Sequence, residues 1–175
     1  GEFFEPGVVL HSEMQSGTNG DGFVLTSYVA LCLIETMESL EDASTKTNAQ
    51  NSITRALRYV SQSLDEGKKS SALANEKTAV YSVIVSVYAL VSVCAEDSFN
   101  AYCDLATTWI RTVIEKIGNN EIDGAVSYGG TGSSNALKIE TTAYVVLIYT
   151  KMRDSGNNFC YSALKYLLQK RNEFG

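Results

Sequence analysis

Residues 78–94 read Thr-Ala-Val-Tyr-Ser-Val-Ile-Val-Ser-Val-Tyr-Ala-Leu-Val-Ser-Val-Cys. Valine at alternate positions would suit a strand, because β-branched side chains favour strands. However, the run is longer than an ordinary strand, and residues 68–117 contain neither Gly nor Pro. Thr78, Ser82 and Ser86 also fall on one helical face as a polar stripe. The segment therefore predicts an inner helix that is enclosed on nearly all sides.

Two further segments, Phe23 to Ile34 and Leu137 to Tyr149, are also apolar nearly all round and predict inner helices. Segments with a single apolar face alternate with them and predict outer helices. The apolar positions of these outer segments are Ile53, Leu57, Val60 and Leu64, then Ala106, Ile110, Val113, Ile114 and Ile117, then Cys160, Leu164, Leu167 and Leu168.

The inner segments resemble one another. Residues 26–31 (Thr-Ser-Tyr-Val-Ala-Leu) match residues 142–147 (Thr-Ala-Tyr-Val-Val-Leu), and Tyr88-Ala-Leu lies between them. A repeat of one inner and one outer helix is typical of αα-hairpin arrays. We therefore predict an all-α fold with about three αα-hairpins, arranged as part of an α/α toroid in a single domain over residues 1–175. A partial toroid would expose the flanks of inner helices, so we expect it to self-associate or to bind its missing half.

Composition limits the possible partners. The chain has 175 residues, 14 Lys and Arg against 20 Asp and Glu, and a formal net charge of −6. This net negative charge makes nucleic acid an improbable partner, because phosphate binding depends on clustered basic residues. No apolar run reaches the length of a membrane span, and no signal peptide is evident at the first residues. We expect a globular domain with no membrane insertion and no cofactor.

The four cysteines permit one pairing prediction. Cys94 ends an expected inner helix and Cys103 begins the next outer helix, so a disulfide between them would bridge the neck of that hairpin. Cys32 lies in an apolar helix and is expected to be a buried thiol. Cys160 stays unassigned. With no Cys-x-x-Cys and a single His, a zinc site is not expected.

Residues 7–31 read Gly-Val-Val-Leu-His-Ser-Glu-Met-Gln-Ser-Gly-Thr-Asn-Gly-Asp-Gly-Phe-Val-Leu-Thr-Ser-Tyr-Val-Ala-Leu. This stretch resembles the second half of the thioester-containing domain of the third and fourth complement components, the α2-macroglobulins and the insect thioester-containing proteins. The likeness continues through residues 81–90 and 139–147 and ends in residues 166–175.

The resemblance implies a piece of a secreted, extracellular protein of innate immunity that attaches covalently to targets. The family's Cys-Gly-Glu-Gln run, which forms the internal thioester, is not in this sequence. It is expected in the other half of the domain, outside this chain. The implied partners are the remainder of the thioester domain, the parent protein, and glycans or proteins on target surfaces. No independent enzyme activity is expected of the chain by itself.

His11 and Glu13 are the candidate catalytic residues. From the residues alone, a single histidine without a base, nucleophile or metal partner identifies no site. The resemblance implies that His11 attacks the thioester carbonyl, forms an acyl-imidazole and frees a thiolate, which acts as base toward a hydroxyl group. It also implies that Glu13 orients this histidine. We expect His11 at the end of the toroid where the inner helices begin, open toward the thioester.

Two other functions stay open. One is a protein-binding docking module on an α/α scaffold without thioester chemistry. The other is a different toroid enzyme, such as a terpene cyclase or a prenyltransferase β-subunit, which would need an Asp-rich or zinc-ligand motif that the sequence lacks. The glycine-rich residues 17–22 are expected to turn the chain into the first helix, and residues 128–135 are expected to form a flexible connection.

Overall fold

The computed structural model describes residues 2–3, 23–69, 77–94, 100–130, 132–154 and 156–171. Its helices, in chain order, are α1 (Phe23–Thr36), η2 (Met37–Ser39), α2 (Ala43–Lys69), α3 (Lys77–Ser92), α4 (Asn100–Trp109), the π-helical η5 (Ile110–Ile114), α5 (Glu115–Ile117), η6 (Ile122–Gly124), α6 (Asn135–Lys151) and α7 (Asn158–Gln169). Strands β1 (Asn119–Asn120) and β2 (Val126–Ser127) lie between α5 and α6.

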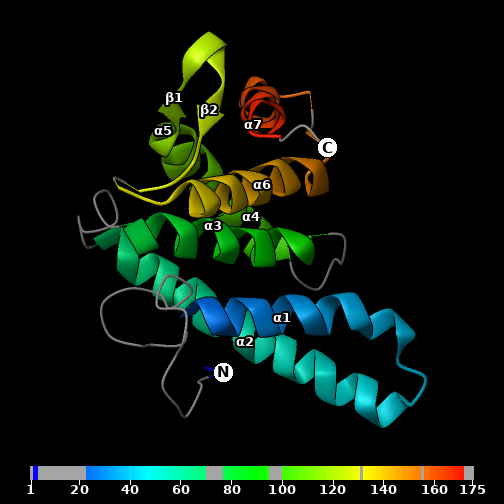
Figure 1. Cartoon of the computed structure of the whole chain (residues 1–175). Helices are drawn as coiled ribbons and strands as arrows, with labels where there is room; N and C mark the ends of the chain where they lie inside the picture. Colours follow the sequence, from blue (N-terminus) through cyan, green and yellow to red (C-terminus); the bar gives the residue numbers. More distant parts are fainter. Residues whose placement is uncertain are drawn as a thin grey trace.

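Helices α1, α3 and α6 form an inner layer, with α3 in the middle and all three running in the same direction (Figure 1). Each is followed by an outer helix that packs against it: α2 on α1, α4 on α3 and α7 on α6. This arrangement confirms the prediction of three αα-hairpins with alternating inner and outer helices. It also confirms that the valine-rich run is helical, since Lys77–Ser92 is α3.

Burial differs among the inner helices. On α3, the apolar side chains from Val80 to Val87 are all buried, which confirms that this helix is enclosed. Helices α1 and α6 each keep an open side, with Leu25 37% and Leu147 42% exposed. Cys32 on α1 is also exposed, so the expectation of a buried thiol is wrong. The physical reason is that α3 packs closely against an inner helix on both flanks, whereas α1 and α6 each pack closely only against α3 and meet each other through a few long side chains.

The outer helices bury the predicted face in two cases, and in the third they bury a rotated face that shares Cys160 with the prediction. Ile53, Leu57, Val60 and Leu64 of α2 are buried, and so are Ala106, Ile110 and Ile114 along α4 and η5. In α7 the buried side chains are Cys160, Ala163 and Tyr166. Leu164 and Leu168, which the sequence places in the core, are 42% and 57% exposed, and Tyr161 is 68% exposed. These three exposed side chains are called the α7 apolar stripe below.

A short β-ladder was not expected from the sequence. Asn119 pairs with Ser127 and Asn120 with Val126 in an antiparallel register. The ladder leads into Tyr128, Gly129 and Gly130, all of which are buried. A Cβ at Gly129 would lie 2.9 Å from Cγ of Lys138, so the absence of a side chain permits this close approach to α6. The first part of the predicted flexible connection is therefore packed.

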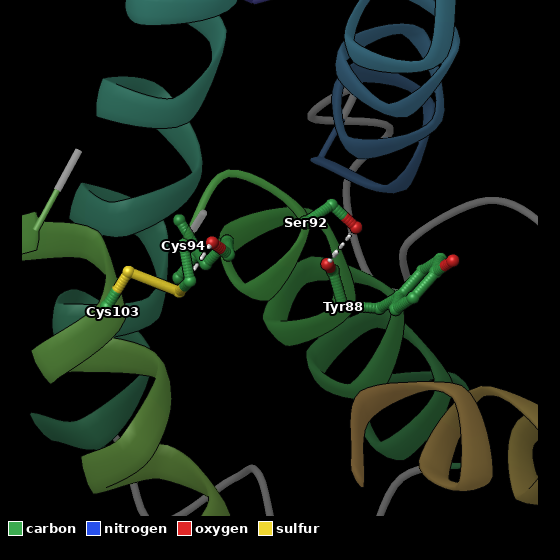
Figure 2. The surroundings of a disulfide bond; sticks show 5 residues. Tyr88, Ser92, Cys94 and Cys103 are labelled. Atoms are coloured by element: carbon green, nitrogen blue, oxygen red, sulfur yellow. Dashed lines mark hydrogen bonds between the residues drawn. A yellow bond between two sulfur atoms is a disulfide. The ribbon is translucent and has the colours of Figure 1, made fainter. Parts of the chain in front are cut away.

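The disulfide joins Cys94 at the end of α3 to Cys103 in α4, and their Cα atoms are 5.4 Å apart (Figure 2). This is the pairing that the sequence predicts, and the separation is within the roughly 7 Å that a disulfide can bridge. Nearby, the Ser92 hydroxyl donates to the Tyr88 carbonyl at 2.9 Å, which closes the last turn of α3. In the described part of the chain, no helix has the length and apolar character required to span a membrane.

Candidate functional site

The predicted catalytic residues, His11 and Glu13, lie outside the described residues, as do the glycines at 17–22. The described residues on either side of this segment are Phe3 and Phe23. Phe23 begins α1, and the Phe3 backbone N–H donates to Oγ1 of Thr26, in the first turn of α1, at 2.8 Å. The two described residues that flank this segment, Phe3 and Phe23, therefore both lie at the amino-terminal end of α1.

Two equivalent threonines hold the segments that precede inner helices. Thr26 accepts a hydrogen bond from the backbone of Phe3, and Thr142, its counterpart in the sequence repeat, accepts one from the backbone N–H of Tyr128 at 2.9 Å. Both threonines are fully buried. The repeated threonine therefore has a second role besides packing. Its buried hydroxyl accepts a hydrogen bond from the backbone of the segment that precedes the inner helix.

Helices α1 and α3 are also joined directly by side chains. The hydroxyls of Ser27 on α1 and Ser86 on α3 are 3.0 Å apart and buried. Ser86 belongs to the polar stripe that favoured a helix in the sequence. Its position against Ser27 shows that this part of the stripe faces the neighbouring inner helix rather than solvent.

One carboxylate and three phenols meet across all three inner helices. Glu140 of α6 accepts at Oε1 from the Tyr81 hydroxyl of α3 at 2.8 Å and from the Tyr28 hydroxyl of α1 at 3.2 Å. The Tyr28 and Tyr81 hydroxyls are also hydrogen-bonded to each other. The Tyr144 hydroxyl of α6 donates to that of Tyr28 at 3.2 Å. We call these four residues the tyrosine–glutamate cluster.

The rings of the cluster pack around Tyr144. Its ring centroid lies 6.3 Å from that of Tyr28 and 6.4 Å from that of Tyr81, both in edge-to-face geometry. Tyr88 lies 5.5 Å away on a tilted plane. The repeated tyrosines Tyr28, Tyr88 and Tyr144 therefore meet in space, and the edge-to-face pairs are the arrangement that aromatic quadrupoles favour.

Burial makes the three phenols of the cluster less acidic than an ordinary tyrosine, which is itself neutral at pH 7. Burial is the largest cause that raises the pKa of Tyr28, Tyr81 and Tyr144 above the ordinary value of a tyrosine. The charge of Glu140 raises the pKa of Tyr81 and Tyr144 further, since a second negative charge beside the carboxylate is unfavourable. At neutral pH the three phenols of the cluster are therefore neutral hydroxyl donors.

Sequence reasoning did not identify this cluster. The one local signal is the spacing of Glu140 and Tyr144, which places them on the same face of α6. The other partners come from α1 and α3, and nothing in their spacing indicates that they point at a carboxylate on a third helix. Among the described residues, no group of three or more His, Cys, Asp or Glu side chains has the arrangement of a metal site.

Comparison with known proteins gives one result. A family model described as the A-macroglobulin TED domain, the thioester-containing domain, matches residues 1–175. Searches of curated proteins and of solved structures found no significant match. The matched region includes residues 7–31, the α1 start and all three inner helices.

Proposed function

Because this chain belongs to the A-macroglobulin TED domain family, we propose that it carries the acyl-transfer histidine of a protein that tags its targets covalently through an internal thioester. The observation that carries this proposal is the match over residues 1–175, because the matched region includes the His-Ser-Glu-Met element at residues 11–14. The targets proposed are hydroxyl groups on surface glycans or proteins, and the biological role is opsonisation.

The reaction has two steps. In the first, a neutral ring nitrogen of His11 attacks the thioester carbonyl carbon, the carbon–sulfur bond breaks, and the cysteine leaves as a thiolate. In the second, the thiolate takes the proton of a target hydroxyl, whose oxygen attacks the acyl carbon. The carbon–nitrogen bond then breaks, so that His11 is released and the products are an ester and a thiol. Glu13 accepts from the other ring nitrogen and orients the imidazole.

The thioester itself must come from another part of the parent protein. None of the four cysteines of this chain is followed by Gly, so the chain contains no Cys-Gly-Glu-Gln run. The role proposed for the described fold is to hold the start of α1, where the Phe3–Thr26 hydrogen bond fixes one end of the segment that carries His11. The bond between Cys94 and Cys103 is consistent with a secreted protein, because disulfides persist in oxidising compartments.

The test is activation of the parent protein in the presence of labelled glycerol and labelled methylamine. In the His11→Ala variant, we expect glycerol incorporation to fall on the order of 100-fold, because the acyl-imidazole and its thiolate base are lost. Methylamine incorporation should persist, because an amine can attack the thioester directly.

Glu38→Gln is the matched control, since it removes an exposed carboxylate in η2, just beyond the opposite end of α1. Unchanged glycerol incorporation in His11→Ala would contradict the role of this residue. If the wild-type parent protein incorporates neither label, the docking module without thioester chemistry becomes the better explanation.

A further inference from the structure

The geometry of the tyrosine–glutamate cluster points to a second binding site on the inner layer. We propose that Glu140 and Tyr144 bind an alkylammonium group, the chemistry of a lysine side chain or of a small primary amine. This inference rests on the described residues and does not depend on the thioester chemistry proposed above.

The first step is a count of protons. The three phenols supply three hydroxyl protons. Tyr144 donates to Tyr28, and Tyr81 donates to Glu140. Tyr28 has acceptors within reach at Tyr81 and at Glu140. Whichever of these two accepts, every hydroxyl proton is used inside the cluster. The cluster therefore has no donor left to offer to a ligand.

The second step concerns the acceptors that stay open. Both hydrogen bonds to Glu140 reach the same oxygen, Oε1, and no described residue donates to Oε2. The Tyr144 hydroxyl donates to Tyr28 and accepts from no described residue. Glu140 and Tyr144 are one helical turn apart on α6, so the two open oxygens lie on the same face of the helix. Glu140 is exposed, so a ligand can reach it.

The third step is the charge. Within the described part of the chain, Glu140 has no cationic partner, whereas Glu35 of α1 is paired with Lys151 at 3.2 Å. The three phenols are neutral, so Glu140 is the one acidic side chain of the cluster. The whole chain has a formal net charge of −6, which attracts cations to its surface.

An alkylammonium group fits these constraints better than other ligands. It offers three donors and no acceptor, the complement of a site with open acceptors only. An anion would be repelled by Glu140, and a neutral alcohol would forgo the charge-assisted hydrogen bond. A divalent metal ion usually takes more carboxylate ligands than the one present here. The methylene groups of the ligand would contact the tyrosine rings, which also attract a cation.

The experiment is a titration of the 175-residue chain with n-butylammonium chloride, followed by the near-ultraviolet difference spectrum of tyrosine. Sodium chloride at equal ionic strength and neutral n-butanol are the reference titrations. We expect a saturable change with n-butylammonium and none with either reference, because only the amine supplies both charge and donors.

Variants then locate the site. Glu140→Gln keeps the shape of the side chain and removes its charge, and should weaken binding on the order of tenfold. Tyr144→Phe should weaken it by a smaller factor. Tyr88→Phe and Glu35→Gln are matched controls and should bind as the wild type does. Tyr88 contacts the Tyr144 ring but is not part of the hydroxyl network, and Glu35 is an inner-layer carboxylate outside the cluster.

Equal binding by Glu140→Gln and the wild type would overturn the proposal. If circular dichroism shows that this variant is unfolded, the proposal is judged from the titrations of the wild-type chain with n-butylammonium and the two references alone. A difference spectrum that fails to saturate, or that sodium chloride or n-butanol reproduces, also overturns the ammonium site.

Discussion

Helices α3 and α7 show how position in the layers, more than composition, decides which apolar side chains are buried. Helix α3 contacts α1, α6 and α4, and its side chains from Val80 to Val87 are buried. Helix α7 contacts α6 and β2, and its apolar stripe of Tyr161, Leu164 and Leu168 is exposed. A leucine on α7 and an isoleucine on α3 therefore contribute very differently to the stability of the same domain.

The largest expected effect is a direct test of this difference. Ile84 of α3 is completely buried, so Ile84→Ala should lower the free energy of unfolding by about 3 kcal/mol, because it leaves a cavity in the core. Leu168→Ala on α7 should change it by less than about 0.5 kcal/mol. Urea unfolding followed by circular dichroism measures both, and equal losses would show that α7 is not open in solution.

The next effect concerns the covalent link at the end of α3. Replacing Cys94 and Cys103 together by Ala should lower the free energy of unfolding by about 2.5 to 3 kcal/mol, because the short loop that they close is no longer restrained in the unfolded chain. Cys32→Ala is the matched control, and its exposed thiol should contribute less than about 0.5 kcal/mol. Comparable unfolding curves for the double variant and the control would mean that the bond adds no stability.

A third expectation concerns association rather than stability. The α7 apolar stripe should cause weak self-association and binding of a hydrophobic dye at high protein concentration. Replacing Leu164 and Leu168 by Ser should weaken self-association on the order of tenfold, because about 1.4 kcal/mol of apolar contact is lost. Sedimentation velocity measures this. A wild-type chain that stays monomeric and binds no dye would contradict the expectation.

The smallest effect belongs to an exposed helix start on the outer layer. The Asp42 carboxylate accepts from the backbone N–H of Thr45 at 2.7 Å and from the Ser44 hydroxyl at 2.8 Å, and these hydrogen bonds lower the pKa of Asp42. A lowered folded-state pKa contributes stability that is present above the unfolded-state pKa, roughly 3.9. That stability is lost as the pH falls through the folded-state pKa.

Asp42→Asn keeps a capping oxygen but cannot be ionised, so the difference in Tm between this variant and the wild type should be small at pH 7 and should vanish toward pH 2. Thermal unfolding across this pH range is the measurement. A difference that grows as the pH falls would have the wrong sign for this mechanism.

The comparison of α3 with α7 also shows what sequence alone can provide. The valine-rich run of α3 is identified as a helix because long breaker-free stretches and a polar stripe outweigh β-branched composition. On α7 the sequence identifies Cys160 as buried but misses Ala163 and Tyr166, because these two share helical spacing with Cys160 just as the leucines do. Periodicity finds an apolar face, but only the neighbouring helix determines which of two such faces is covered.

In the candidate site, too, some features could be predicted from the sequence and others depend on how the helices pack. The tethering threonines could have been predicted from the repeat, since Thr26 and Thr142 occupy equivalent positions. Strands of two residues leave no alternation to detect, so the ladder before Tyr128 has no signal in the sequence. The partners of Glu140 come from two other helices, α1 and α3, and their convergence depends on how these helices pack against α6.

The tyrosine–glutamate cluster has a further consequence for the order in which the chain folds. Each αα-hairpin brings together residues that are close in sequence, whereas the hydrogen bond between Tyr28 and Glu140 spans 112 positions. Closing so large a loop costs more entropy and slows contact formation, so we expect the hairpins to form first and the hydroxyl network last. Mutations in the network should therefore speed unfolding and leave the folding rate nearly unchanged. Glu140 on α6 would thus slow the release of α1 from the folded domain, because their hydrogen bond forms last and must break first.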